Sequence, residues 1–291
     1  MKNSKNYLTD KNLKILKRKV DLHSHTNYSD GFHSPEELVH KAKDVGIDIL
    51  SITDHDSVNG IEEATKIGEK LGVEIIPGVE ISSDLRGVEV HILGYFVDID
   101  NKELEHYLEF FREERVRRAA RIIEKLNNLG LEITLDDVLE KAKNSAVGRP
   151  HIAQAMLEKE IVNTYFAAFN KYIKNGGPAY ERKVHLSPQS AFKIISDAGG
   201  LSFIAHPAHM PESMIKELID AGADGIEVIH PSHSRELTRF YRGIVNEYFL
   251  LESGGSDFHG GKREDGDKFG KFFTAPIVVD AMRTRLVKNS A

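Results

Sequence analysis

Short apolar runs alternate with longer amphipathic segments over most of the chain. The runs cover residues 20–23, 47–53, 73–80, 88–97, 201–205, 225–229 and 249–251. Apolar runs of this length that are separated by helices are typical of buried parallel strands. About seven such strands favour a parallel α/β barrel over a doubly wound sheet.

Residues that typically begin or end helices lie between these apolar runs. Ser34, Pro35 and Glu37 supply an N-cap, a proline at the first helical position and an acidic residue at the third, so they predict a helix over residues 34–45. Further helices are predicted over residues 60–71 and 187–199. The alternation of strand and helix therefore occupies both ends of the chain.

The middle of the chain has a different pattern. One apolar stripe, which Gly130 ends, predicts a long helix and consists of Leu104, Leu108, Phe111, Ile122, Leu126 and Leu129. Thr134 and Asp137 predict the start of a second helix, and further helices are expected over residues 150–160 and 164–173. We expect a leader at 1–19, a barrel formed by 20–100 and 178–291, and an inserted helical subdomain at 101–177.

Composition narrows the chemistry. The chain has no cysteine, which excludes disulfides, thiolate metal sites and cysteine nucleophiles. Its net charge of -6 argues against broad phosphate-driven binding of nucleic acid, duplex DNA included, but allows a small phosphorylated substrate. We find neither an apolar signal region nor a stretch of bilayer length, so we expect a cytoplasmic protein that does not bind membranes.

Side chains that bind metal ions follow the predicted strands. His23 and His25 are one residue apart, which places both imidazoles on one face if the first strand continues through them. The complete set is His23, His25, Asp30, His55, Glu80, His91, His206, Asp257 and His259. Each has an ordinary alternative as a turn former, a helix-start acid or a buried polar group. Gathered at one barrel mouth, they would leave unpaired charge unless cations lay among them. Imidazole and carboxylate together suit Zn, Mn or Fe, and Glu80 could bridge two ions.

The motifs containing these residues resemble those of the PHP (polymerase and histidinol phosphatase) family of metal-dependent phosphoesterases. They read D-L-H-S-H-T-N-Y-S-D-G, S-I-T-D-H-D, P-G-V-E-I, V-H-I-L-G-Y, A-H-P and G-S-D-F-H. The resemblance implies a distorted (β/α)7 barrel with two to three divalent ions. It assigns His23, His25, Glu80 and Asp257 to one ion, Glu80, His91 and His206 to a second, and Asp30, His55 and His259 to a third.

Two motifs in and after the insertion are similar to the branch that acts on nucleotides, which contains nucleoside 3′,5′-bisphosphate phosphatases and enzymes that trim short RNA from the 5′ end. They are V-G-R-P-H-I-A, which includes Arg149, and G-P-A-Y ahead of Lys183. The sequence Glu181-Arg182-Lys183 departs from the Val-Pro expected before the basic residue. Arg149 is a candidate phosphate clamp, because guanidinium matches phosphate oxygens and a helix N-terminus follows it.

Other charged residues have two interpretations. His209, His230 and His233 lie just beyond strand ends, where they could position substrate or protonate the leaving oxygen, or serve as capping groups. We predict His209 and His233 as catalytic groups with Glu80, and Arg149, Lys183 and His230 as phosphate ligands. Arg115 and Arg118 fall near the apolar stripe of the predicted long helix and could reach toward substrate, but we expect them to join Glu113 and Glu114 in a surface charge lattice.

The predicted function is hydrolysis of phosphate esters of nucleotides. Two cations bridged by Glu80 could generate a hydroxide near neutral pH, and the insertion would cap the site and select a nucleotide. The substrate would be a nucleoside 3′,5′-bisphosphate or a short 5′-phosphorylated RNA. The alternatives are a phosphatase for another small ester such as histidinol phosphate, or a non-catalytic module that binds phosphorylated ligands. The bond broken, the metal ions and the oligomeric state stay open.

Overall fold

The computed structural model describes residues 18–143, 146–184, 186–208, 210–261 and 265–289. Within them, one seven-stranded sheet runs in the order β1 to β7. Its strands are β1 (Lys19–Asp21), β2 (Ile47–Ile52), β3 (Glu74–Leu85), β4 (Val88–Tyr95), β5 (Leu201–Ile204), β6 (Gly225–Ile229) and β7 (Leu251–Gly254). The Leu22 amide donates to the Gly254 carbonyl at 3.1 Å and the Asp257 amide to the His23 carbonyl at 2.9 Å, which joins the two ends of the sheet. The predicted α/β barrel is confirmed.

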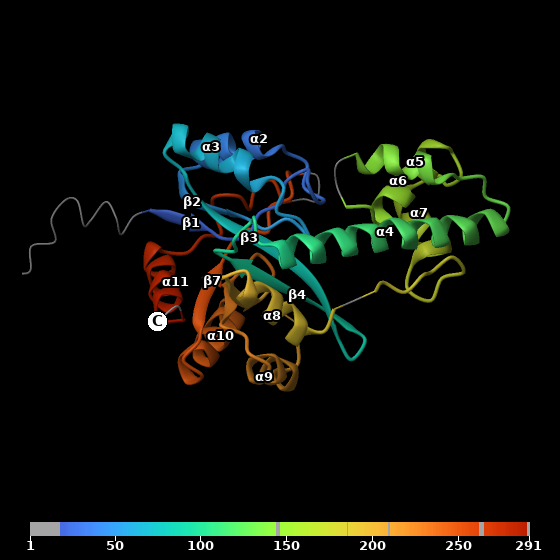
Figure 1. Ribbon diagram of the computed structural model, residues 1–291. Coiled ribbons are helices and arrows are strands. Elements are labelled where there is room, and N and C mark those ends of the chain that lie inside the picture. Colours follow the sequence, from blue (N-terminus) through green and yellow to red (C-terminus); the bar gives the residue numbers. More distant parts are fainter. Residues whose placement is uncertain (1–17, 144–145, 185, 209, 262–264, 290–291) are drawn as a thin grey trace, which may run out of the picture.

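Helices cover the outside of the barrel. Those next to the sheet are α2 (Pro35–Asp44), α3 (Ile61–Leu71), α8 (Pro188–Asp197), α9 (Glu212–Asp220), α10 (Arg235–Glu247) and α11 (Pro276–Asn289). Helices α2 and α3 lie on one flank and α8 to α11 on the opposite flank (Figure 1). The Ser34 hydroxyl accepts from the Glu37 amide while the Glu37 carboxylate accepts from the Ser34 amide, so α2 begins with the predicted capping box.

The expectation of a wholly parallel sheet is wrong for β4, which pairs antiparallel with both β3 and β5. Only Arg86 and Gly87 separate β3 from β4, and both have positive φ, of 57° and 85°. A two-residue loop of this conformation reverses the chain, whereas a parallel neighbour needs a long crossover. Glu80 and His91 consequently lie within strands instead of at strand ends, on a hairpin that extends past the barrel mouth.

Between β4 and β5 the chain is helical, as expected. The elements before α8 are α4 (Lys102–Asn128), α5 (Leu135–Ala142), α6 (Arg149–Glu158), α7 (Tyr165–Ala168) and the π-helix η1 (Phe169–Ile173). They extend to one side of the barrel (Figure 1) and bury a separate apolar cluster that includes Ile122, Leu126, Ile152 and Met156. The boundaries given above for leader, barrel and insertion stay a prediction, although Lys19 already begins β1.

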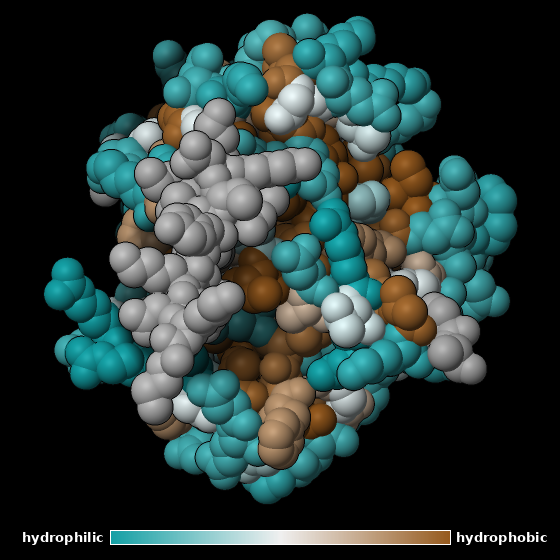
Figure 2. Space-filling view, turned by 90° about the vertical axis from the view of Figure 1, so that its left-hand side faces the viewer, coloured by the Kyte–Doolittle hydropathy of each residue, from teal (hydrophilic) through white to brown (hydrophobic). Residues whose placement is uncertain are grey.

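The face seen from the side of β1 and α11 carries both polar and apolar side chains. Hydrophilic side chains line most of the edge of this face, and hydrophobic ones show nearer its middle (Figure 2). Some apolar residues are exposed on the described surface, including Phe249, Ile277 and Val287. Among the described residues, every helix is too short or too polar to cross a bilayer.

Candidate metal centre

The segment that follows β1 carries the first two histidines into the barrel mouth. His23 and His25 are buried, and the His25 amide donates to the Phe258 carbonyl at 2.9 Å. The Asp21 carboxylate accepts from the amides of His23 and Ser256, so it ties this segment to the loop after β7. A Cβ on Gly255 would lie 2.4 Å from the His23 amide nitrogen, so only glycine allows this approach.

Four ligand atoms converge as the resemblance implies for the first ion. His25 Nε2 lies 3.3 Å from Glu80 Oε2 and 3.1 Å from Asp257 Oδ1. His23 Nε2 lies 3.4 and 3.2 Å from the same two oxygens. These are the spacings of neighbouring ligands on a cation whose bonds are about 2.0–2.2 Å long.

The other oxygen of Glu80 faces a second pair of imidazoles. Glu80 Oε1 lies 2.9 Å from His91 Nδ1 and 3.1 Å from His206 Nε2. Glu80 is therefore the common member of two groups, the arrangement expected of a bridging carboxylate. The antiparallel course of β4 makes this possible, because it brings His91 beside Glu80 from the neighbouring strand.

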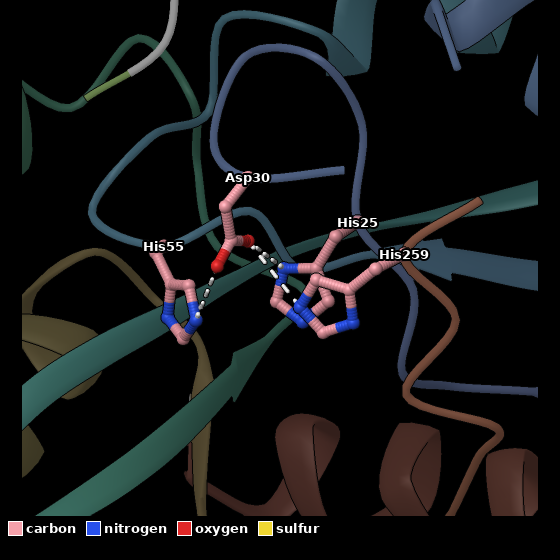
Figure 3. Close-up of side chains that lie close together, drawn as sticks. All are labelled: His25, Asp30, His55 and His259. Carbon is pink, nitrogen blue, oxygen red and sulfur yellow. Dashed lines mark ion pairs between the residues drawn. The ribbon is translucent and has the colours of Figure 1, made fainter. Parts of the chain in front are cut away.

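Asp30 gathers a third group from loops far apart in the sequence. Figure 3 shows the side chains of His25, His55 and His259 pointing toward its carboxylate. Asp30 Oδ1 lies 3.3 Å from His259 Nε2 and 3.8 Å from His25 Nδ1, and Oδ2 lies 3.7 Å from His55 Nε2. His25 thus lies between the first and third groups, and the geometry adds it to the three residues that the resemblance assigned there.

Buried atoms without hydrogen bonds show that these groups fit cations. Within the described part of the chain, His23 Nε2, His55 Nδ1 and Glu80 Oε2 are buried and accept or donate no hydrogen bond. Such atoms are costly unless a ligand satisfies them. Burial lowers the pKa of His55 to about 3, which keeps it in the neutral form that binds metal. Burial alone would raise the pKa of Glu80, but the imidazoles of His55, His91 and His23 hold it well below its usual range.

Two buried carboxylates that lie outside the predicted ligand set support the segments that carry the ligands. Glu227 in β6 is fully buried, and its two oxygens lie 2.9 Å from His23 Nδ1 and 2.7 Å from the His206 amide. Asp54 accepts from the Thr26 amide at 2.7 Å and from the Ser29 hydroxyl. The contact of Glu227 with His23 fixes the tautomer and direction of that imidazole, whereas Asp54 holds the backbone that follows His25. The sequence signal for Glu227 is a charged residue within an otherwise apolar strand.

Three residues of the site have strained backbone conformations. Asp56, His206 and Asp257 have φ values of 50°, 26° and 51°, in the left-handed region that non-glycine residues seldom adopt. Each of these residues follows or forms part of a strand-end motif. Strain of this kind persists where the surrounding structure determines the conformation, which is typical of functional sites.

The expectation that Arg115 and Arg118 belong to a surface lattice is wrong for both. Arg115 is largely buried and its guanidinium bonds to the carboxylate of Asp56, the residue after His55. Arg118 Nε donates to the Glu181 carbonyl at 3.0 Å. Arg117, which pairs with Glu113 and Glu114, faces solvent. Helical periodicity placed the charges on α4 but could not show which face meets the barrel.

A cationic pocket of about 380 Å3 adjoins these contacts. Its walls include Arg115, Arg118, Arg149, Tyr180, Arg182 and Lys183. Arg149 Nη1 donates to Asn175 Oδ1 at 2.8 Å, and Lys183 Nζ donates to Glu89 Oε1 at 2.6 Å. Burial and the neighbouring charge of Arg149 lower the pKa of Arg118 to about 10. A pocket in which cations crowd one another in this way is suited to an anion.

The remaining predicted residues have different outcomes. The nine predicted metal ligands that converge at the barrel mouth are called the ligand cluster below. His230 Nε2 lies 3.3 Å from Asp257 Oδ2, so His230 adjoins this cluster instead of the cationic pocket. His233 is buried, and its Nδ1 lies 3.0 Å from the Val228 carbonyl. This contact holds the imidazole against the backbone of β6. His209 lies outside the described residues. The catalytic and phosphate-binding roles stay predictions.

Comparison with known proteins agrees with this geometry. The model of the PHP domain family matches residues 21–168. A 5′-3′ exoribonuclease of Haemophilus influenzae is 32% identical over 84% of this chain and 91% of its own length. A 3′,5′-nucleoside bisphosphate phosphatase of Chromobacterium violaceum is also 32% identical, over 82% of this chain and 87% of its own.

Solved structures show the same fold. A protein of Bifidobacterium adolescentis, described as a metal-dependent phosphoesterase, superposes with a TM-score of 0.82 at 30% identity and covers 92% of this chain and 96% of its own. An amidohydrolase of Chromobacterium violaceum, solved with sulfate and without metal, gives a TM-score of 0.76 at 30% identity over 89% and 92%. The similarity thus includes the barrel and the helices inserted in it.

Proposed function

The chain belongs to the PHP domain family, and from this premise we propose that it hydrolyses phosphate esters of nucleotides, either nucleoside 3′,5′-bisphosphates or short 5′-phosphorylated RNA. It is a metal-dependent phosphoric ester hydrolase. The observation that carries the substrate proposal is the cationic pocket beside the ligand cluster. A substrate with two phosphates can place one in each.

The ligand cluster would hold the metal ions. His23, His25, Glu80 and Asp257 would hold the first, Glu80, His91 and His206 the second, and Asp30, His55 and His259 the third. When bound, divalent cations neutralise phosphoryl oxygens and make water a nucleophile near neutral pH. All of these donors are imidazole or carboxylate groups, which suits Mn, Zn or Fe.

The cationic pocket would hold the phosphate that does not react. The Arg149 guanidinium, oriented by Asn175 and by the Ile173 carbonyl, can bind two phosphate oxygens at once. Lys183 would contribute a second positive charge while it stays paired with Glu89. Binding energy from this remote phosphate would position the reacting one and so raise the rate.

A proton for the leaving oxygen is the remaining requirement of the reaction. His230 lies next to Asp257 at the edge of the cluster, and His233 lies behind it with ring centres 5.5 Å apart. His230 would contact the phosphate. His233 would position the substrate or protonate the leaving oxygen, and His209 is the other proposed proton donor.

Phosphate release from a panel of substrates tests the proposal. The protein, reloaded with Mn, is incubated with adenosine 3′,5′-bisphosphate, a short 5′-phosphorylated RNA, AMP and histidinol phosphate, each with a chelator control. We expect turnover of the first two that the chelator abolishes. Turnover of histidinol phosphate alone would replace the proposal with the rival phosphatase activity, and binding of metal without any turnover would favour a ligand-binding module.

A further inference from the structure

A second pocket, of about 660 Å3, borders the ligand cluster and has a different chemistry from the cationic pocket. His91, His206, His230 and Asp257 form its inner edge. We call it the apolar groove, and its outer walls include Val90, Ala205, Ala208, Met210, Pro211 and Met214. Its size falls within the range of roughly 300–1,000 Å3 that is usual for ligand sites.

The walls of the groove come from three parts of the barrel. Val90 lies on β4, Met210 on the loop after β5 and Met214 on α9. Both methionines pack on the barrel core while part of each side chain stays accessible. Methionine adapts its shape to flat or irregular apolar ligands, so this wall suits a nucleobase or a sugar ring.

Charge separates the two pockets. No lysine or arginine lines the apolar groove among the described residues, whereas four arginines and a lysine line the cationic pocket. Both pockets contact Glu89, so they adjoin one another along the start of β4. Phosphoryl oxygens that faced the groove would lose water without gaining a charged partner, which is costly, whereas an organic group would gain from burial.

We infer that the apolar groove receives the second nucleoside of a substrate whose reacting phosphate is a diester, so that the site is built for short 5′-phosphorylated RNA. This rests on the proposed function, in which the 5′-phosphate of the first nucleotide occupies the cationic pocket and the next phosphate lies at the ligand cluster. The second nucleoside, which is attached to that phosphate on the side away from the first nucleotide, then lies in the groove. A nucleoside 3′,5′-bisphosphate has no group there and leaves the groove unfilled.

The reaction adds one water across the bond between phosphorus and the 3′ oxygen of the first nucleotide. The water oxygen stays on phosphorus, and a proton goes to the 3′ oxygen. The dinucleotide pApA therefore gives two molecules of AMP, whereas adenosine 3′,5′-bisphosphate gives AMP and inorganic phosphate. The two products allow both reactions to be measured on one protein.

The test compares kcat/KM for pApA with kcat/KM for adenosine 3′,5′-bisphosphate in wild-type protein, Met214→Ala and Met214→Gln. We expect the ratio of the two values to fall about tenfold in Met214→Ala, because apolar contact with the second nucleoside is lost. Met214→Gln keeps the length of the side chain and guards against a folding defect, which the melting temperature also monitors. Val287→Ala, an exposed change on α11, should leave the ratio unaltered.

Each other result overturns the inference in a recognisable way. If wild-type protein hydrolyses the bisphosphate but not pApA, it lacks the diester site. An equal fall in kcat/KM for both substrates in Met214→Ala would assign the groove to the first nucleoside. An unaltered ratio in both Met214 variants removes the groove from substrate binding. If neither substrate is hydrolysed, the proposed function fails instead. The affinity for pApA is then measured by calorimetry, and an equal affinity in wild type and Met214→Ala would show that the groove does not bind the second nucleoside.

Discussion

The ligand cluster and the cationic pocket are neighbours, but the protein holds them in different ways. The cluster consists of side chains that are fully or largely buried, with the buried carboxylate of Glu227 against His23 and that of Asp54 against the backbone after His25. The cations of the pocket are partly exposed and come from α4, from the start of α6 and from the segment after η1. Rigid support suits the centre at which bonds break and form. A pocket built on inserted helices can differ in substrate preference without disturbing that centre.

Arg115 is the connection between the two regions. It lines the cationic pocket and bonds to Asp56, whose amide donates to the Glu80 carbonyl at 3.0 Å. Asp56 Oδ1 also accepts from the Ser82 amide at 3.2 Å. Burial alone would raise the pKa of Asp56, but Arg115 holds it below its usual range. The insertion thus contacts the backbone that carries Glu80.

The largest effect should come from His25→Ala. His25 lies beside Glu80 and Asp257 of the first group and also belongs to the third, so its loss should lower metal content. We expect kcat to fall more than about 100-fold, which exceeds the loss expected when a residue that only orients a metal ligand is removed. Metal analysis and turnover measure this, with circular dichroism as the check on folding. His40→Ala, an exposed change on α2, is the matched control. Full activity in His25→Ala would remove the cluster from catalysis.

An intermediate effect is expected from Arg149→Ala. It removes a guanidinium from the cationic pocket and leaves the ligand cluster intact, so KM for adenosine 3′,5′-bisphosphate should rise about 10–100-fold while metal content stays at the wild-type level. Steady-state kinetics test this. Arg117→Ala removes a solvent-facing arginine of α4 and serves as the control. A fall in bound metal would show that the two regions are not separable.

The smallest effect is expected at Asp137, which lies outside both the ligand cluster and the cationic pocket. Asp137 closes the capping box of α5 with Thr134 and pairs with Lys159 at 2.7 Å. Asp137→Asn should lower the free energy of unfolding by about 0.5 kcal/mol near neutral pH without changing turnover. The hydrogen bond from Lys159 and those from Thr134 lower the pKa of Asp137 to about 2. The stabilisation is therefore present above pH 4 and lost as pH falls through about 2.

Urea unfolding of wild-type protein and Asp137→Asn at pH 7 and at low pH measures that difference. Asp136→Asn changes an exposed neighbour in the same helical turn and should leave stability closer to wild type. A stability difference that persisted unchanged below pH 2 would contradict the assignment to the Asp137 carboxylate.

Local signals were sufficient for most elements. The N-cap at Ser34 and the capping box at Thr134 predicted helix starts that the structure confirms, because a cap depends only on residues within one turn. The same holds for the apolar stripe of α4 and for the strand-length runs. The direction of β4 was missed, since it depends on the short Arg86-Gly87 turn and not on the pattern of the strand itself.

The sequence by itself determined which side chains can bind metal, because imidazoles and carboxylates stand out within and just after apolar strands. It also determined the strand and helix alternation that brings them to one mouth. Only the tertiary structure decided that His25 belongs to two groups, that Arg115 turns inward to Asp56, and that one neighbouring pocket is cationic and the other apolar. Those outcomes depend on contacts between residues far apart in the chain, and periodicity along a segment carries no information about its partner.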